Sequence, residues 1–223
     1  MSFIIRLPNN IYITNTRREH ARGIEATVRS AYDIDPDEDC DASISADDVL
    51  QQIARFPEGQ FVAIHRQRDR EEVVAMASTM RTSYSPYDQR LPWREQIGSL
   101  GIVNHEPSGD WLYGVEMAVR PDFRRMGIAS AMYKVRFDFI KRLNLRGWYS
   151  GGMLMGYHRY SDKMSPKQYG ENVIAGHLVD PTVTMQMNRG FEGHSVIENY
   201  TVTAPESGNA AVLIIWKNPD FKE

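Results

Sequence analysis

Residues that could bind an anion lie together in the segment RPDFRRMGIASAMYK, residues 120–134. Arg124 and Arg125 lead to Gly127, after which apolar residues recur at the spacing of an amphipathic helix. The first turn of a helix presents unpaired N–H groups and the positive end of the helix dipole, and a glycine lets an anion approach them. The sequence therefore predicts a phosphate-binding loop at 124–130. The apolar face of the predicted helix is made by Ile128, Met132, Val135 and Phe139.

Charge is distributed unevenly around this loop. Residues 120–146 carry a net charge of +6, and the remaining residues carry −9 of the total of −3. Residues 33–48 alone hold eight carboxylates and no lysine or arginine. The negative total and the apolar stripe of the basic helix argue against nucleic acid as a partner. The loop also lacks the Gly-Lys-Ser/Thr of nucleotide triphosphatases and the G-x-G-x-x-G of dinucleotide-binding proteins.

The elements that must position the loop follow a mixed α/β order. Alternation and turn signals predict strands over 11–14, 61–65, 73–79 and 111–119. Helical spacing predicts helices over 18–32 and 46–56, the second capped by Ser45. Residues 82–110 are expected to form a long polar loop. No repeat, low-complexity segment or linker interrupts the chain, so we expect one domain over residues 1–223.

Several classes of protein and site are excluded by composition and spacing. No signal peptide and no apolar run of membrane-spanning length is found, which predicts a cytoplasmic protein without a membrane partner. A single cysteine, Cys40, excludes an internal disulfide and a cysteine-based zinc site. The calcium-like start Asp33-x-Asp35-x-Asp37 fails at the later ligand positions. His158 and His177 lack a second ligand at metal-binding spacing. We therefore expect no metal.

Two motifs resemble those of the GNAT acetyltransferases. RRMGIA, residues 124–129, resembles the Arg/Gln-x-x-Gly-x-Gly/Ala signature and follows a strand ending in MAV. DPTVTMQMNRGF, residues 180–191, resembles a short helix of that family, with Asp180 as N-cap, Pro181 at the first helical position and Gly190 past the end. Strands over 194–203 and 210–216 then complete the expected order. The tail from Met164 also resembles the GNAT domain often fused to a carbon–nitrogen hydrolase.

The resemblance implies the fold and the co-substrate. The fold would be the α/β GNAT fold, with a mixed, mostly antiparallel central sheet flanked by helices. The pyrophosphate of acetyl-CoA would bind the N–H groups of the glycine loop, and the pantetheine arm would pair with residues 117–119 like an extra strand. A main-chain N–H there would polarise the thioester carbonyl. The implied CoA-binding residues are Met117, Ala118, Val119, Arg124, Arg125, Met126, Gly127, Ile128, Ala129 and Ser130.

The resemblance implies the general base and the general acid less directly than it implies the CoA-binding residues. Glu116 lies on the strand where the family often keeps a general base, although an isolated glutamate in a strand is commonly a solvated or paired residue. Gln186 stands where the family has a tyrosine that protonates the departing thiolate. A hydroxyl could come instead from the insert after strand 147–155, which contains Tyr157, Tyr160 and Tyr169. We predict Glu116 as the base and Tyr157 as the acid.

The resemblance favours an N-acetyltransferase that acts on a primary amine of a small molecule or peptide. A non-catalytic acyl-CoA-binding module remains the alternative, because the usual tyrosine is missing. The acidic run 33–48 would border the acceptor cleft in this fold, which predicts a cationic acceptor. A solvated loop that aids solubility is the other interpretation of that run. A homodimer is compatible with the sequence.

Overall fold

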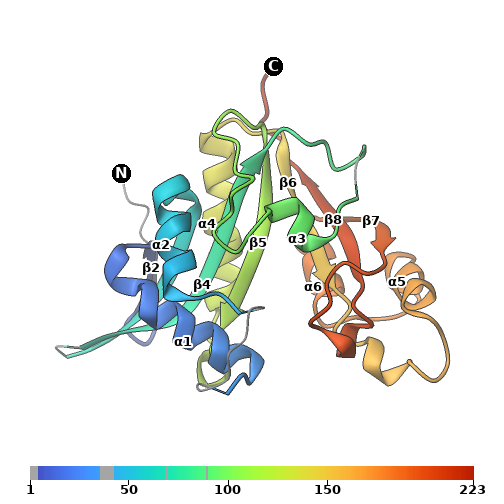
Figure 1. Cartoon of the computed structure of the whole chain (residues 1–223), viewed down its shortest axis with the longest axis horizontal. Coiled ribbons are helices and arrows are strands. Elements are labelled where there is room, and N and C mark those ends of the chain that lie inside the picture. Colours follow the sequence, from blue (N-terminus) through green and yellow to red (C-terminus); the bar gives the residue numbers. More distant parts are fainter. Residues whose placement is uncertain (1–4, 36–42, 69, 89) are drawn as a thin grey trace. The chain divides into compact units, whose positions relative to one another are not determined.

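The computed structural model describes residues 5–35, 43–68, 70–88 and 90–223 (Figure 1). In this part of the chain the strands form one mostly antiparallel sheet in the order β1-β2-β3-β4-β5-β6-β8-β7, with helices flanking it. This confirms the predicted fold class. The chain clusters into two compact units: the first contains residues 1–80, 97–107 and 114–143, and the second contains residues 81–96, 108–113 and 144–223. The expected single domain stays a prediction.

The first unit is built on consecutive antiparallel strands. β1 (Ile5–Leu7), β2 (Ile11–Asn15), β3 (Gln60–Gln67) and most of β4 (Arg70–Thr82) pair in chain order. The predicted strands 11–14, 61–65 and 73–79 are confirmed, and β1 was not predicted. β3 and β4 extend into the charged segment between the predicted strands 61–65 and 73–79, since Arg66 and Glu71 lie opposite each other in register and form an ion pair.

Helices cover both faces of these strands. α1 (Ala21–Tyr32) and α2 (Ala46–Arg55) pack on the face that contains Val62. α1 follows a 3-10 turn at residues 18–20, so the predicted helix is α-helical only from Ala21. The hydroxyl of Ser45 accepts the N–H of Asp48 at 3.2 Å, which confirms the predicted cap. The buried cluster on this face is made by Ala21, Ile24, Val28, Ile44, Val49, Val62, Ile64, Met76 and Ala118.

β5 (Trp111–Val119) and α4 (Ile128–Arg142) flank the predicted phosphate loop, as expected. The apolar face predicted for α4 is buried. Phe139 of α4 meets Phe61 edge to face at 5.6 Å. Because Phe61 and Val62 are neighbours in a strand, their side chains point to opposite faces. α4 therefore lies on the face opposite α1 and α2, as Figure 1 also shows.

The second unit contains β6 (Gly147–Met153), β8 (Ala211–Lys217) and β7 (Glu192–Ile197). β5 begins beside β6 in parallel, and β8 is antiparallel to both β6 and β7. The strand predicted over 194–203 ends at Ile197, because the chain turns at Asn199, which has a left-handed φ of 54°. No helix of the described residues is long and apolar enough to cross a bilayer.

Three helices of this part of the chain correct the sequence-based interpretation. α3 (Trp93–Ile97) lies inside the expected loop 82–110, and α5 (Pro166–Ile174) lies inside the insert. α6 (Val183–Met187) begins after Thr182 and not at Pro181. The carboxylate of Asp180 nevertheless accepts the N–H groups of Thr182 at 2.8 Å and Val183 at 2.9 Å. Asp180 thus caps the helix from a position two residues before the N-cap residue Thr182, and not from the N-cap position itself.

Candidate functional site

The N-terminus of α4 is open toward the region where the sequence predicts a phosphate. Gly127 is the N-cap residue with a left-handed φ of 81°, and no side chain caps the helix. A Cβ added to Gly127 would have no atom of the described chain within 4 Å. Arg125, two residues before Gly127, also has a positive φ of 63°. The loop therefore leaves space for an anion at the first turn of α4, where the N–H groups have no intrahelical partner.

Arg124 ties this loop to two other elements of the first unit. Its Nη2 donates to the carbonyl of Ala31 at 2.8 Å, and its Nε donates to the carbonyl of Val119 at 3.3 Å. Ala31 lies in the last turn of α1, and Val119 ends β5. Arg124 thus has a positioning role that the sequence did not suggest. The prediction that it also adds charge to a phosphate site stays a prediction.

Glu116 lies on the face of β5 that meets α1. It is two residues before Ala118, which packs against Ala21, Ile24 and Val28 of α1, and side chains two apart in a strand share a face. Glu116 is partly buried, and its carboxylate accepts a hydrogen bond from the hydroxyl of Tyr32. Burial of the hydroxyl, and then the Glu116 carboxylate, raise the pKa of Tyr32, while Arg124 lowers it.

The exposure of Tyr32 is unequal along its side chain. The residue is 53% exposed, although its hydroxyl is desolvated beside Glu116. The two observations differ because the first concerns the whole residue and the second concerns the titrating end. This pair could not be predicted, since nothing in a sequence shows that the last residue of α1 reaches the middle of a distant strand.

Met117, on the other face of β5, contacts a buried cation. Arg136 of α4 is 2% exposed, and its Nη2 donates to the Met117 sulfur at 3.0 Å. Its Nε donates to the carbonyl of Met132 at 3.1 Å, and its guanidinium lies 4.7 Å from the ring centre of Tyr133. Burial lowers the pKa of Arg136 to about 10, and Tyr133 opposes that shift. Arg136 therefore stays charged at neutral pH behind the strand predicted to pair with pantetheine.

Tyr157, the predicted acid, lies in the second unit. It is 9% exposed, and its hydroxyl donates to the carbonyl of Met164 at 3.2 Å. Its ring centre lies 5.8 Å from that of Tyr169, whose hydroxyl donates to Asp180 at 3.2 Å. Gln186 is buried in α6. The catalytic assignment of Tyr157 stays a prediction, and its described contacts are those of a packing residue.

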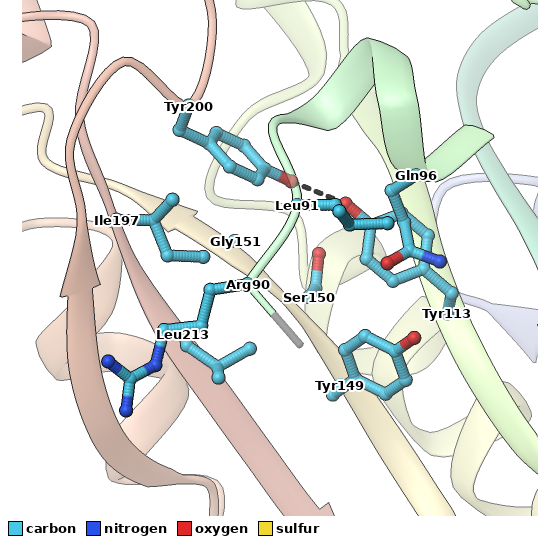
Figure 2. A pocket seen from close by; sticks show the side chains of 10 residues that line it. All are labelled: Arg90, Leu91, Gln96, Tyr113, Tyr149, Ser150, Gly151, Ile197, Tyr200 and Leu213. Atoms are coloured by element: carbon cyan, nitrogen blue, oxygen red, sulfur yellow. Dashed lines mark hydrogen bonds between the residues drawn. The ribbon is translucent and has the colours of Figure 1, made fainter. Parts of the chain in front are cut away.

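The second unit also contains a tyrosine-lined hollow (Figure 2). The hydroxyls of Tyr113 and Tyr200 are 2.6 Å apart, and Tyr149 lies beside them. Burial raises the pKa of Tyr113. Burial also raises the pKa of Tyr200, to about 12, although the hydrogen bonds of Tyr200 with Tyr113 and with the backbone of Gly151 oppose this shift. The cavity volume of the hollow is about 10 Å³, far below the roughly 300–1,000 Å³ of sites that enclose a small molecule.

Comparison with known families matches residues 27–150, more than half of the chain and including β5 and the glycine loop, to the Acetyltransferase (GNAT) family. The chain belongs to the GNAT acetyltransferase family. The curated relatives of this GNAT chain are from Bacillus subtilis. It is 32% identical over 173 residues to the probable hydrolase YhcX, covering 78% of this chain and 33% of YhcX. It is 28% identical over 179 residues to the uncharacterized N-acetyltransferase YkwB, covering 80% of this chain and 77% of YkwB.

The chain thus spans about a third of YhcX, which agrees with the resemblance to GNAT domains fused to hydrolases. Solved structures confirm the GNAT fold. The loading GNATL domain of CurA from Lyngbya majuscula has a TM-score of 0.76 at 15% identity, covering 94% of this chain and 98% of that one. The GphF GNAT-like decarboxylase in complex with isobutyryl-CoA has a TM-score of 0.70 at 16% identity, covering 92% and 98%.

Proposed function

We propose that this GNAT chain transfers the acetyl group of acetyl-CoA directly to a primary amine. The observation that carries the proposal is the open, uncapped N-terminus of α4, reached through Gly127 and directly following β5. Family membership and the isobutyryl-CoA bound to GphF support an acyl-CoA as the ligand. Residues 125–129 would hold the pyrophosphate through their N–H groups, and residues 117–119 would pair with the pantetheine arm.

Glu116 and Tyr157 are the residues proposed for the proton chemistry of this reaction. An acceptor amine must lose a proton as it attacks the thioester carbonyl, and Glu116 is the carboxylate proposed to take it, directly or through one water. A main-chain N–H near Met117 would stabilise the negative charge that develops on the carbonyl oxygen. The thiolate of CoA must then gain a proton, for which Tyr157 remains the proposed donor.

Turnover of acetyl-CoA tests the proposal directly. The purified chain is incubated with acetyl-CoA and a panel of primary amines, and both free CoA thiol and acetylated amine are measured. We expect the two products in equal amounts with at least one amine. Thiol release without acetylated amine, for every amine of a chemically broad panel, would contradict amine acetylation.

A glycine substitution tests the position of the CoA site. Gly127→Glu places a carboxylate where the phosphates would lie, so thermal stabilisation by CoA should be lost. Gly176→Glu is the matched control, because Gly176 has a similar φ of 77° and equally open space ahead of its Cβ. Both variants carry the same left-handed strain. Equal stabilisation by CoA in both variants would place the CoA site elsewhere.

Acyl-CoA binding without amine transfer is the second candidate function. Gln186 replaces the usual tyrosine, and two structural neighbours are described as a loading GNATL domain and a GNAT-like decarboxylase. The discriminating measurement repeats the incubation with malonyl-CoA and without amine. Release of CO₂ with formation of acetyl-CoA would favour decarboxylation, and unchanged thioester with retained CoA binding would favour a binding module.

A further inference from the structure

Tyr32 connects the end of a helix to the proposed catalytic strand. It is the last residue of α1, and Asp33 ends the helix with a left-handed φ of 57° and an N–H bonded to the carbonyl of Arg29. The amphipathic face of α1 packs on β5 through Ala118, so the helix cannot rotate without disturbing the core. Glu116 lies on this same face of β5, and the Tyr32 hydroxyl bonds to its carboxylate.

The glycine loop is fastened to the same helix end. Arg124 donates to the carbonyl of Ala31, the residue directly before Tyr32, and to the carbonyl at the end of β5. The end of α1, the strand with Glu116 and the proposed phosphate loop are therefore joined by hydrogen bonds within one unit. A shift of the loop would move Ala31 and, with it, the hydroxyl that binds the proposed base.

We propose that Tyr32 is a positioning residue for Glu116: its hydroxyl keeps the carboxylate ionised and directed, and Arg124 couples this arrangement to the CoA loop. The part that concerns transfer rests on the proposed function. A hydrogen bond donated to a carboxylate favours its charged form, which is the form that a general base needs. The phenol stays protonated at neutral pH and can donate, since both its burial and Glu116 raise its pKa.

Two arginines, Arg124 and Arg136, lie near the strand that carries Glu116. Arg124 of the glycine loop acts on the Tyr32 hydroxyl and opposes the effect of Glu116. Arg136 of α4 contacts Met117, whose side chain points to the opposite face of β5. Tyr32 from α1 and Arg124 from the loop are thus two described groups expected to affect the proton affinity of Glu116.

Tyr32→Phe removes the hydroxyl and keeps the ring, and Tyr12→Phe is its matched control. Tyr12 also lies in the first unit and donates to a glutamate, with its oxygen 2.8 Å from Glu71. Proteins labelled with ¹³C at the glutamate carboxyl are titrated by NMR, with Glu116→Gln used to assign the resonance. The Glu116 midpoint should rise by on the order of one pH unit in Tyr32→Phe and stay unchanged in Tyr12→Phe. This readout does not require activity.

Kinetics then test the catalytic consequence. In Tyr32→Phe the acid limb of the pH profile of kcat/KM for the amine should move to higher pH. At pH values below the midpoint of this limb, kcat/KM should be roughly tenfold lower than in the wild type, since each pH unit is a tenfold change in the ionised fraction of Glu116. CoA affinity and the melting temperature should match those of Tyr12→Phe.

An unmoved NMR midpoint would overturn the inference whether or not the wild type is active. A wild type inactive on all amines, with a moved midpoint, would instead contradict the proposed function alone. A shifted midpoint with an unshifted acid limb would remove Tyr32 from the reaction.

Discussion

Glu116 is the residue on which the proposed chemistry depends, and its surroundings explain how a strand residue can act as a base. The carboxylate is partly buried and held by a phenol, while its neighbour Met117 on the other face contacts a buried arginine. An ordinary solvated strand glutamate would have neither the partial burial nor the phenol. The structure thus argues against a fully solvated Glu116 and agrees with a paired one, and its role as the base stays a prediction.

Glu116→Gln should lower kcat/KM for the amine by about 100-fold or more, the usual loss for a general base, while CoA affinity stays nearly constant. The amide cannot accept the proton, although it keeps the shape of the side chain. Steady-state kinetics and thermal stabilisation by CoA measure the two effects. Glu71→Gln is the control, since Glu71 also accepts a hydrogen bond from a tyrosine. Full activity with an unchanged pH profile in Glu116→Gln would remove this residue from the mechanism.

The residues of the site differ in how far the sequence could predict them. Gly127 was predictable because a local pattern places it between a strand and an amphipathic helix, and its left-handed φ is a local property. Tyr32 and Arg136 were not, because their contacts with β5 join residues 84 and 19 positions apart in the chain. Local spacing carries no information about such pairings.

The elements show the same division between local and distant effects. β5 and α4 have the predicted bounds or nearly so, since alternation and helical periodicity are local and these segments are long. α3 has only five residues, so it offers too little periodicity to be recognised inside a polar loop. β3 and β4 are longer than predicted because charged residues pair across the hairpin, which a hydrophobic pattern does not reveal.

The entry into α1 provides a pH-dependent test at this scale. The Nδ1 of His20 accepts the N–H of Arg17 at 3.0 Å, and burial, opposed by Glu19, lowers the pKa of His20. A lowered pKa means that the unfolded chain binds the proton more tightly than the folded one. The stabilisation is therefore present above about pH 6.5, the ordinary value for histidine, and is lost as the pH falls through the folded-state value.

His20→Gln keeps a hydrogen-bond acceptor at this position of the capping box and does not titrate. Between pH 7.5 and 5 the melting temperature of the wild type should therefore fall further than that of His20→Gln, by about 2–4 °C for a hydrogen bond of about 1 kcal/mol in a chain of this size. Differential scanning calorimetry at both pH values measures the difference. A parallel decrease in the two proteins would show that protonation of His20 does not destabilise the turn.

At the scale of the whole molecule, the uneven charge of the sequence is partly neutralised by local pairs. Arg120 pairs with Glu72 and Asp122, and Lys134 pairs with Asp138. Arg124 and Arg125, at the glycine loop, are exposed. Lys141 and Arg142, in the last turn of α4, are exposed as well, so the basic segment presents charge at both ends of this helix. The charge at the first end agrees with an anionic co-substrate, and the negative total charge argues against a broad nucleic-acid surface.

The acidic run 33–48 is the other charged region, and its residues 36–42 lie outside those that the structure describes. Its first residues directly follow Tyr32, so in sequence the run adjoins the residue that binds the proposed base. A cluster of carboxylates at this point would attract a cationic acceptor and repel an anionic one, and salt would weaken both effects. We therefore predict a preference for polyamine-like, basic peptide or aminoglycoside-like amines over amino acids that bear extra carboxylates.

The preference is measured as the ratio of kcat/KM for a cationic and an anionic amine of matched size, at low and high salt. The wild type should favour the cationic amine by about tenfold at low salt, a difference of about 1.4 kcal/mol. A variant with Asp35, Asp37, Glu38 and Asp39 changed to Asn or Gln should lose most of this ratio while its CoA affinity is retained, because the glycine loop is untouched. The same ratio in both proteins would mean that these carboxylates only solvate the loop, and the acceptor would then be selected by other residues.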